Sequence, residues 1–210
     1  MKSRRRPAGR QARAARRSLP KPAPALDVGA EIARLSATLA GETDLVRCLE
    51  HLLTAARRAT RAEAGTVYLR RGDTLEFAAV QNDVLAKRKG EAEVRKLLAA
   101  QPLSLRSASI ASYVVLTRAT VNLGDAYEIP LDRPYSLFRE VDRKADYRTR
   151  SMLATPLRDA QGRVFGVLQL INATDDGGHV GSFTAEHQAL VQTLAALAAQ
   201  MPASAKAATS

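Results

Sequence analysis

The stretch RSMLATPLRDAQGRVFGVLQLIN, residues 150–172, decides the fold of this chain. It contains two apolar runs, residues 151–157 and 164–171, which the polar segment RDAQGR separates. Within that segment Gly162 can adopt a positive φ, and Asp159 can hydrogen-bond its own backbone, as turn residues do. The stretch therefore predicts a β-hairpin whose second strand, apolar on both faces, lies inside a sheet.

Strict alternation of side chains along the second strand assigns its residues to two faces. One face is expected to carry Phe165, Val167, Gln169 and Ile171, and the other Val164, Gly166, Leu168 and Leu170. Gln169 interrupts an otherwise apolar strand, so its amide needs a hydrogen-bond partner from a ligand or from the backbone.

Helical and extended patterns surround this hairpin. The expected elements are helices over 26–40 and from 43 or 44 onward, a hairpin of strands 66–70 and 74–80, a helix over 110–118, a strand over 120–123 and a final helix over 184–201. Residues 87–96 are expected to form a mobile loop or a short helix. Residues 127–147 are expected to be irregular, and a loop of that length in a compact domain is usually functional or disordered.

The net charge of +11 is concentrated at the N-terminus. Residues 1–25 contain nine Lys or Arg residues and no acid, which leaves 23 basic against 21 acidic residues in the rest of the chain. We expect a disordered basic tail over 1–25, a single domain over 26–201 and a disordered C-terminal tail over 202–210. The basic tail can hold nucleic acid or an anionic membrane surface through its charge, or serve only for solubility.

Composition and motifs argue against several classes of protein. A single cysteine, Cys48, rules out an intramolecular disulfide and is typical of a reducing, cytoplasmic compartment. No apolar run reaches the roughly 18 residues of a membrane span. His51, His179 and His187 form no metal-ligand motif, and no P-loop or nucleophile elbow is present. The sequence therefore predicts a non-catalytic protein that needs no metal or cofactor.

Five segments, in chain order, resemble the GAF domains, a family of small-molecule-sensing modules. They are AGTVYL (64–69), TVNLGDAY (120–127), YRTRSMLATPL (147–157), GRVFGVLQLIN (162–172) and FT (183–184). The resemblance covers about residues 30–200, and it is greatest to GAF domains beside bacterial HD-GYP phosphodiesterases and in cyclic-nucleotide phosphodiesterases and cyclases. It implies an α+β fold, with a six-stranded antiparallel sheet, the N- and C-terminal helices on one face and a loop-roofed ligand pocket on the other.

Cyclic-nucleotide-responsive members of the family carry an Asn-Lys pair, then Phe and, after three residues, Asp-Glu. This sequence keeps Asn172 and Phe183 but has Ala173 in place of the Lys, and His187 and Gln188 in place of the acids. The substitutions remove an ion pair that supports the pocket from outside, so the resemblance to these members is incomplete.

Six polar residues form the predicted ligand-binding set: Ser109, Asn122, Asp125, Arg148, Arg150 and Gln169. Strand alternation places Arg148 and Arg150 on one face, where two guanidinium groups can hold a phosphate or carboxylate, or else pair with acids of the preceding loop. Ser109 lies at a predicted helix N-terminus, where free N–H groups favour anions, or it is a simple N-cap. Asn122 and Asp125 are equally common as turn formers.

These features together predict a stand-alone, non-catalytic sensory or regulatory protein of a bacterial-type cytoplasm, with a small anionic, nucleotide-like ligand. The ligand would order residues 127–147 and alter the packing of the end helices in a parallel homodimer, as is usual in the family, and an output protein would act in trans. The alternative is an interaction module with a vestigial pocket that docks its basic tail on nucleic acid or a protein. A third class, a redox enzyme like the GAF-type reductases of free methionine sulfoxide, would depend on Cys48, and one thiol cannot form an internal disulfide relay.

Overall fold

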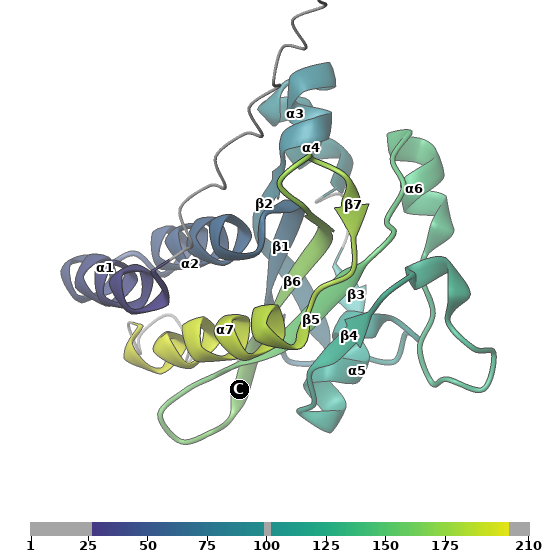
Figure 1. Cartoon of the computed structure of the whole chain (residues 1–210). Coiled ribbons are helices and arrows are strands. Elements are labelled where there is room, and N and C mark those ends of the chain that lie inside the picture. The colour runs from purple at the N-terminus through teal and green to yellow at the C-terminus, as the bar shows by residue number, and fades with distance from the viewer. Residues whose placement is uncertain (1–26, 99–101, 202–210) are drawn as a thin grey trace, which may run out of the picture.

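A computed structural model of the chain describes residues 27–98 and 102–201. The tails predicted for residues 1–25 and 202–210 lie outside these residues and stay predictions. In the described part, helices cover both faces of a central antiparallel sheet (Figure 1).

Seven strands make up the sheet: β1 Ala62–Arg71, β2 Thr74–Asn82, β3 Leu103–Ser104, β4 Val121–Leu123, β5 Met152–Arg158, β6 Val164–Thr174 and β7 Val180–Gly181. Six of them follow the order β3-β2-β1-β6-β5-β4 with every pairing antiparallel, and β7 pairs with the end of β6. The predicted six-stranded antiparallel sheet is therefore confirmed, with β7 as a two-residue addition.

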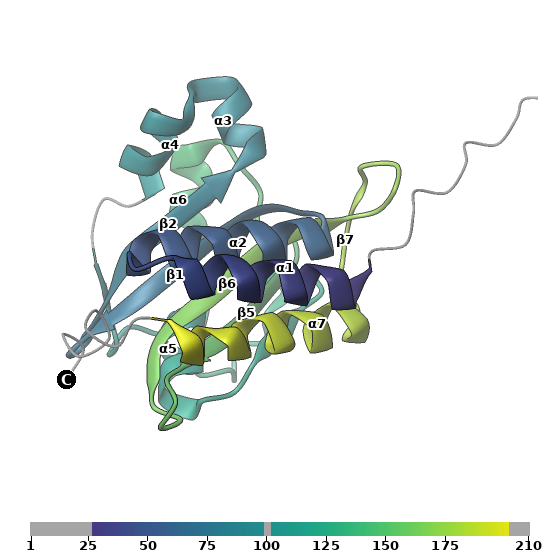
Figure 2. The same cartoon turned by 90° about the vertical axis from the view of Figure 1, so that its left-hand side faces the viewer.

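The described helices are α1 Val28–Gly41, α2 Leu45–Thr60, α3 Asp83–Lys89, α4 Glu91–Leu98, α5 Ile110–Thr117, α6 Arg139–Ala145, α7 Ala185–Ala196 and the short 3-10 helices η1 Ala126–Glu128 and η2 Leu197–Gln200. Helices α1, α2 and α7 lie side by side on one face of the sheet, and α5 and α6 lie on the other (Figures 1 and 2). Asp44 caps α2, and Thr184 caps α7. No helix of the described part is long and apolar enough to cross a membrane.

Two segments are more regular than the sequence suggested. Residues 127–147 were predicted to be irregular, but they contain the seven-residue helix α6. The many charged residues and the prolines of this segment gave no helical pattern in the sequence. Residues 87–96 fall within α3 and α4, so the helical alternative is the right one for this segment. These helices are stabilised by a contact between distant parts of the chain, because Leu85 and Val94 are buried together with Ala145 of α6.

The hairpin of β5 and β6 forms as predicted. Asp159 Oδ1 accepts hydrogen bonds from the backbone N–H groups of Gln161 and Arg163, both at 2.9 Å, and Gly162 has φ +75°. Strand β6 lies between β1 and β5 and is buried along nearly its whole length, which confirms its place inside the sheet.

The predicted alternation along β6 is wrong at the start of the strand. Leu157 pairs with Gly166 while Arg158 pairs with Val164, so Phe165 is the extra residue of a β-bulge. Phe165 therefore packs in the core beneath the helices, and Val164 packs on the opposite face, the reverse of the expected assignment.

Two apolar clusters stabilise the sheet, one on each face. The larger lies beneath α1, α2 and α7 and includes Leu49, Leu53, Leu168 and Leu194, each fully buried. Burial of such a side chain contributes about 1.5–3 kcal/mol relative to its exposure. Cys48 belongs to this cluster, as expected for a small core residue.

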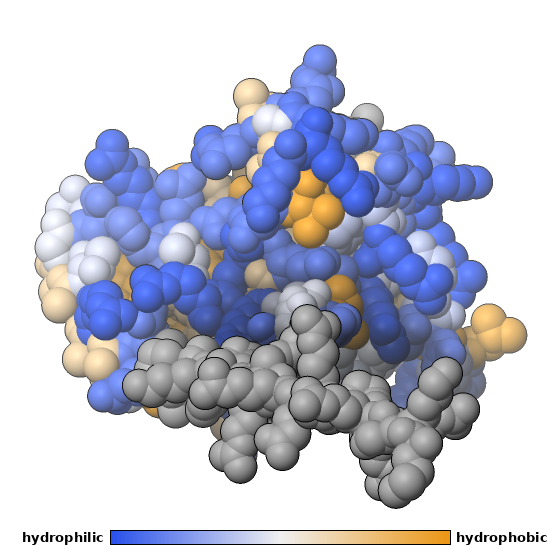
Figure 3. Space-filling model, turned by 45° about the horizontal axis from the view of Figure 1, so that its top comes forward, coloured by the Kyte–Doolittle hydropathy of each residue, from blue (hydrophilic) through white to orange (hydrophobic). Residues whose placement is uncertain are grey.

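The face of the molecule drawn in Figure 3 shows no apolar area as broad as the two buried clusters. Its coloured part is mostly hydrophilic, and apolar side chains occupy small separate spots rather than one broad patch (Figure 3). Broad exposed apolar patches mark protein interfaces, so this part of the surface gives no support to docking of a protein there.

Substitution of Gly166 tests the pairing of β6 with β1. A Cβ at this position would lie 2.4 Å from the backbone oxygen of Tyr68, which the sheet holds in place. We expect Gly166→Ala to lower the free energy of unfolding by about 2 kcal/mol in urea denaturation. Gly181→Ala is the control, because a Cβ there meets nothing within 4 Å and should change stability by less than about 0.5 kcal/mol. Equal effects of the two substitutions would contradict this pairing.

Candidate functional site

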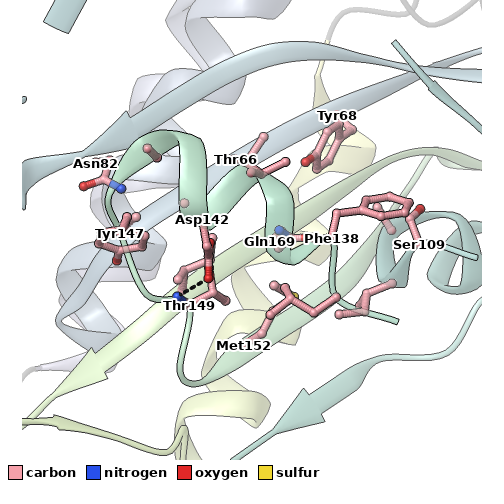
Figure 4. Close-up of a pocket in the computed structure, with 18 of the residues that line it drawn as sticks. Thr66, Tyr68, Asn82, Ser109, Phe138, Asp142, Tyr147, Thr149, Met152 and Gln169 are labelled. Atoms are coloured by element: carbon pink, nitrogen blue, oxygen red, sulfur yellow. Dashed lines mark hydrogen bonds between the residues drawn. The ribbon is translucent and has the colours of Figure 1, made fainter. Parts of the chain in front are cut away.

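A cavity of about 150 Å³ lies between the sheet and the helices α5 and α6. Strands β1, β2, β5 and β6 form its floor, and α6 with the segment before it forms its roof. Figure 4 shows the residues that matter most: Thr66, Tyr68, Met152 and Gln169 on the floor, and Phe138 and Asp142 in the roof.

Three polar side chains of the cavity floor have no hydrogen-bond partner within residues 27–98 and 102–201. Thr66 and Gln169 face each other in the register of β1 and β6, and Tyr68 follows Thr66 on the same face. The residues are only 6%, 8% and 6% exposed, respectively. Within the described residues their side-chain polar atoms make no hydrogen bond, although every completely buried side-chain N or O there has a partner. These atoms must therefore border the open space of the cavity.

The protonation state of the cavity tyrosines is fixed. Burial raises the pKa of Tyr68 far above its ordinary value. Burial, followed by the charge of Glu63 and the hydrogen bond to it, does the same to the pKa of Tyr147. Both hydroxyl groups therefore keep their protons at physiological pH and can act as hydrogen-bond donors.

Asp142 fastens the roof to the rest of the domain. Its Oδ2 accepts hydrogen bonds from the backbone N–H of Thr149 at 2.7 Å and from the Tyr127 hydroxyl at 2.9 Å, and its Oδ1 accepts from Thr149 Oγ1 at 2.8 Å. The dashed line in Figure 4 marks this contact between Asp142 and Thr149. We call these three hydrogen bonds the Asp142 latch. It ties α6 to the segment that leads into β5.

A second polar cluster holds the segment between α6 and β5. Asn172 has φ +59°, and its Nδ2 donates to Glu63 Oε2 at 2.8 Å and to the backbone oxygen of Arg148 at 2.9 Å. Its Oδ1 accepts from the backbone N–H of Arg150 at 2.7 Å. The Tyr147 hydroxyl donates to the same Glu63 oxygen at 2.9 Å. Asn172 thus joins β6, β1 and the end of the roof.

Two of the six residues predicted for the site, Ser109 and Gln169, line the cavity. Ser109 caps α5, since its Oγ accepts from the backbone N–H of Ser112 at 3.0 Å and donates to Ser112 Oγ at 2.7 Å. The N-cap alternative therefore describes its structural role. Gln169 has its side chain in the cavity, and its contact with a ligand stays a prediction.

Asn122 and Asp125 lie outside the lining of the cavity, which corrects their expected position. Asn122 donates to the backbone oxygen of Phe183 at 3.2 Å and so connects β4 to the segment before α7. Asp125 accepts from the backbone N–H of Tyr127 at 2.8 Å as the cap of η1. Asp125 therefore has the local turn role that its residue type left open, whereas Asn122 lies in β4 and contacts a residue 61 positions away, so it is not a turn former.

Arg148 and Arg150 also lie outside the lining, and they do not converge on one point. Arg148 lies 3.6 Å from Asp125, and Arg150 donates to the backbone oxygen of Val180 at 3.2 Å. Both side chains are exposed, whereas Thr149 between them is buried and lines the cavity. The two arginines were expected to point to one face because strand alternation was assumed for them. Both residues precede the start of β5 at Met152, so this alternation does not apply to them.

Sequence reasoning missed Thr66, Tyr68, Asp142 and Thr149. Thr66 and Tyr68 alternate with apolar residues in a predicted strand, so a signal for them existed. Asp142 is one of many charged residues in its segment, and nothing in the local sequence distinguishes it.

The lining carries little charge in the part of the chain that the structure describes. Asp142 is the only charged residue there, and no Lys, Arg, His or Cys joins it. Cys48 lies in the core on the other face of the sheet. No group of three or more His, Cys, Asp or Glu residues in residues 27–98 and 102–201 could hold a metal ion.

Comparison with known sequences identifies relatives among phosphodiesterases. The chain is 27% identical over 154 residues to the cGMP-specific 3',5'-cyclic phosphodiesterase of Drosophila erecta, a match that covers 72% of this chain and 13% of that protein. It is 38% identical over 68 residues to the dual 3',5'-cyclic-AMP and -GMP phosphodiesterase 11A of Takifugu rubripes, which covers 32% of this chain and 7% of that protein. The chain therefore spans only a small part of the curated relatives it matches.

Solved structures share the fold. The GAF domain of a phosphoenolpyruvate-protein phosphotransferase from Coxiella burnetii matches with a TM-score of 0.63 and 20% identity over 88% of this chain and 98% of that one. The free methionine-R-sulfoxide reductase of Neisseria meningitidis matches with a TM-score of 0.57 and 21% identity over 87% and 89%. Residues 44–201 match the sequence model of the family described as GAF domain, and this chain therefore belongs to the GAF domain family.

Proposed function

We propose that this GAF domain is a non-catalytic regulatory module that binds a small molecule in the cavity beneath α6. The observation that carries the proposal is the row of unpartnered polar side chains on the cavity floor, Thr66, Tyr68 and Gln169. Because these polar atoms border the open space of the cavity, solvent or a ligand can reach them. A ligand that hydrogen-bonds to this row takes the place of solvent there and is held by it.

The chemistry of the lining supports regulation rather than catalysis. The lining offers hydroxyl groups, amides and one carboxylate, and the Thr149 hydroxyl that donates to this carboxylate at 2.8 Å belongs to the Asp142 latch. A reductase with the same fold acts on methionine sulfoxide, but the sole thiol of this chain is buried on the far side of the sheet. A single reduced thiol also supports a cytoplasmic location.

The roof offers a way for the ligand to change the conformation. Helix α6 closes the cavity through the Asp142 latch, the latch holds the segment that leads into β5, and α7 packs on β5. A ligand that binds one arrangement of the roof more tightly shifts the population toward it. We infer that this shift reaches α1 and α7 in a parallel homodimer and is read by an output protein in trans. Analytical ultracentrifugation tests the dimer.

Nucleotides are the first ligands to test, because the curated relatives are named as cyclic-nucleotide phosphodiesterases. Isothermal titration calorimetry would compare cyclic GMP, cyclic AMP, GMP and AMP. The Thr66→Phe variant, in which a ring fills the cavity, is the blocked control, and Thr66→Ser keeps both the space and the hydroxyl group. A cavity ligand is expected to bind the wild type and Thr66→Ser but not Thr66→Phe. Binding that Thr66→Phe retains would place the site elsewhere.

A second candidate function, docking of the basic tail on nucleic acid, rests on the nine cations of residues 1–25. Deletion of residues 1–25 should then abolish binding to a DNA duplex, and the intact chain should show a steep salt dependence because bound counterions are released. Fluorescence anisotropy at several salt concentrations measures both. Equal affinity with and without the tail would remove this function.

A further inference from the structure

Among the residues that the structure describes, none with a positive side chain lines the cavity to hold an anion. Asp142 is the only charged residue of the lining among the described residues, and both of its oxygens already accept hydrogen bonds. Arg148 and Arg150 are exposed and bind other groups. The amino end of α5 reaches the lining, but Ser109 already caps it. A phosphate or carboxylate placed here would lose its hydration without a counter-charge, which is costly.

The size of the cavity limits the ligand further. Its volume is about 150 Å³, and a protein cavity of about that size accommodates a single benzene ring. Sites for larger, drug-sized ligands usually measure about 300–1,000 Å³. A single ring therefore fits beneath the roof as it stands, whereas a complete nucleotide requires α6 to move away.

The walls suit a flat ring. Tyr68 and Phe77 have ring centroids 4.8 Å apart at an angle of 53°, and Phe138 of the roof, which is 43% exposed, also lines the cavity. Met152 and Ile171 complete the apolar surface. Aromatic side chains hold a further ring by offset stacking or edge contacts.

The polar side chains of the cavity floor determine which hydrogen-bonding groups the edge of the bound ring should carry. The Gln169 amide presents one acceptor and one donor group side by side in a plane. A ligand that pairs with this amide needs a donor next to an acceptor on one edge of its ring, such as the –CO–NH– edge of a cyclic amide. Bidentate pairing of this kind is how Asn and Gln read adenine. Thr66, opposite Gln169 in the sheet, adds a hydroxyl that can donate or accept.

We propose that the cavity takes an uncharged single-ring molecule with a cyclic-amide edge, which Gln169 binds through two hydrogen bonds. The inference rests on the proposed function, since it names the ligand class of the same cavity. It differs from the anionic, nucleotide-like ligand that the sequence predicted, because the arginines behind that prediction lie outside the cavity.

Uracil and 2-pyridone are suitable probes, because both are neutral single rings with a –CO–NH– edge. Orotate, which is uracil with an added carboxylate, is the anionic comparison, and benzene is the apolar one. In calorimetry the wild type should bind uracil or 2-pyridone at least about tenfold more tightly than orotate. Gln169→Leu keeps most of the side-chain volume and should weaken that binding about 10- to 100-fold, while its affinity for benzene stays within about threefold. Retained benzene binding also shows that the variant is folded.

Three results would overturn the inference. The first is that neither uracil nor 2-pyridone binds the wild type, and the second is that Gln169→Leu binds them as tightly as the wild type does. The third is that orotate or a cyclic nucleotide binds more tightly than uracil and loses its affinity in Thr66→Phe. That third result leaves the regulatory function intact, and it separates a wrong ligand class from a wrong site.

Discussion

Replacement of Asn172 by alanine is expected to lower the free energy of unfolding by about 3 kcal/mol. The backbone contributes about 1 kcal/mol of this, since φ is +59° and alanine pays a steric cost in the left-handed region. The side chain contributes the rest, because Glu63 Oε2 and the Arg150 N–H lose a partner in a partly buried place. Urea denaturation followed by circular dichroism measures the change.

Asn172→Gly separates the two contributions. Glycine adopts the positive φ without strain, so this variant should be about 1 kcal/mol more stable than Asn172→Ala while it lacks the same hydrogen bonds. An Asn172→Ala protein within about 0.5 kcal/mol of the wild type would show that the polar cluster does not hold the segment between α6 and β5.

Asp142→Ala is expected to release the roof of the cavity. The substitution removes three hydrogen bonds, and bonds to a charged group contribute about 1.5–3 kcal/mol each. If the local stability of the roof falls by about 2–3 kcal/mol, amide hydrogen exchange in α6 and at Thr149 should become about 30- to 150-fold faster. Exchange measured by NMR resolves these amides individually.

The matched control for the latch lies on the same helix. Glu140 is exposed and forms an (i, i+4) pair with Lys144 at 3.2 Å, so Glu140→Ala changes charge without touching the cavity. Exchange in α6 should change less than about threefold in this variant. If Asp142→Ala and Glu140→Ala accelerate exchange equally, the carboxylate of Asp142 does not fasten the roof.

Most of the longer helices and strands could be predicted because their sequence patterns are local. The apolar stripe of α2, the turn chemistry of Asp159 and Gly162 and the apolar runs of β5 and β6 each follow from spacing of a few residues. The bulge at Phe165 could not be predicted from the sequence, because the alternation of residues along the strand does not indicate where an extra residue is inserted.

The sequence identified cavity residues where one broke its local pattern, Gln169, or lay at a predicted helix start, Ser109. Gln169 stood out because an amide in an apolar strand requires a partner. Asp142 did not, because it is one of several charges in its segment and is buried only once α6 folds over the sheet. The predicted position of Arg148 and Arg150 in the site was wrong for a related reason. The direction of their side chains depends on where β5 starts, and both residues precede it.

The central claim, that the cavity beneath α6 is a ligand site, is tested most directly by a saturation-transfer NMR screen. Single-ring compounds, nucleosides and nucleotides would be screened against the wild type, Thr66→Ser and Thr66→Phe. We predict compounds that bind the first two proteins and not the third, since only Thr66→Phe fills the cavity. If no compound binds the wild type, or the same compounds bind all three proteins, the cavity is not a ligand site.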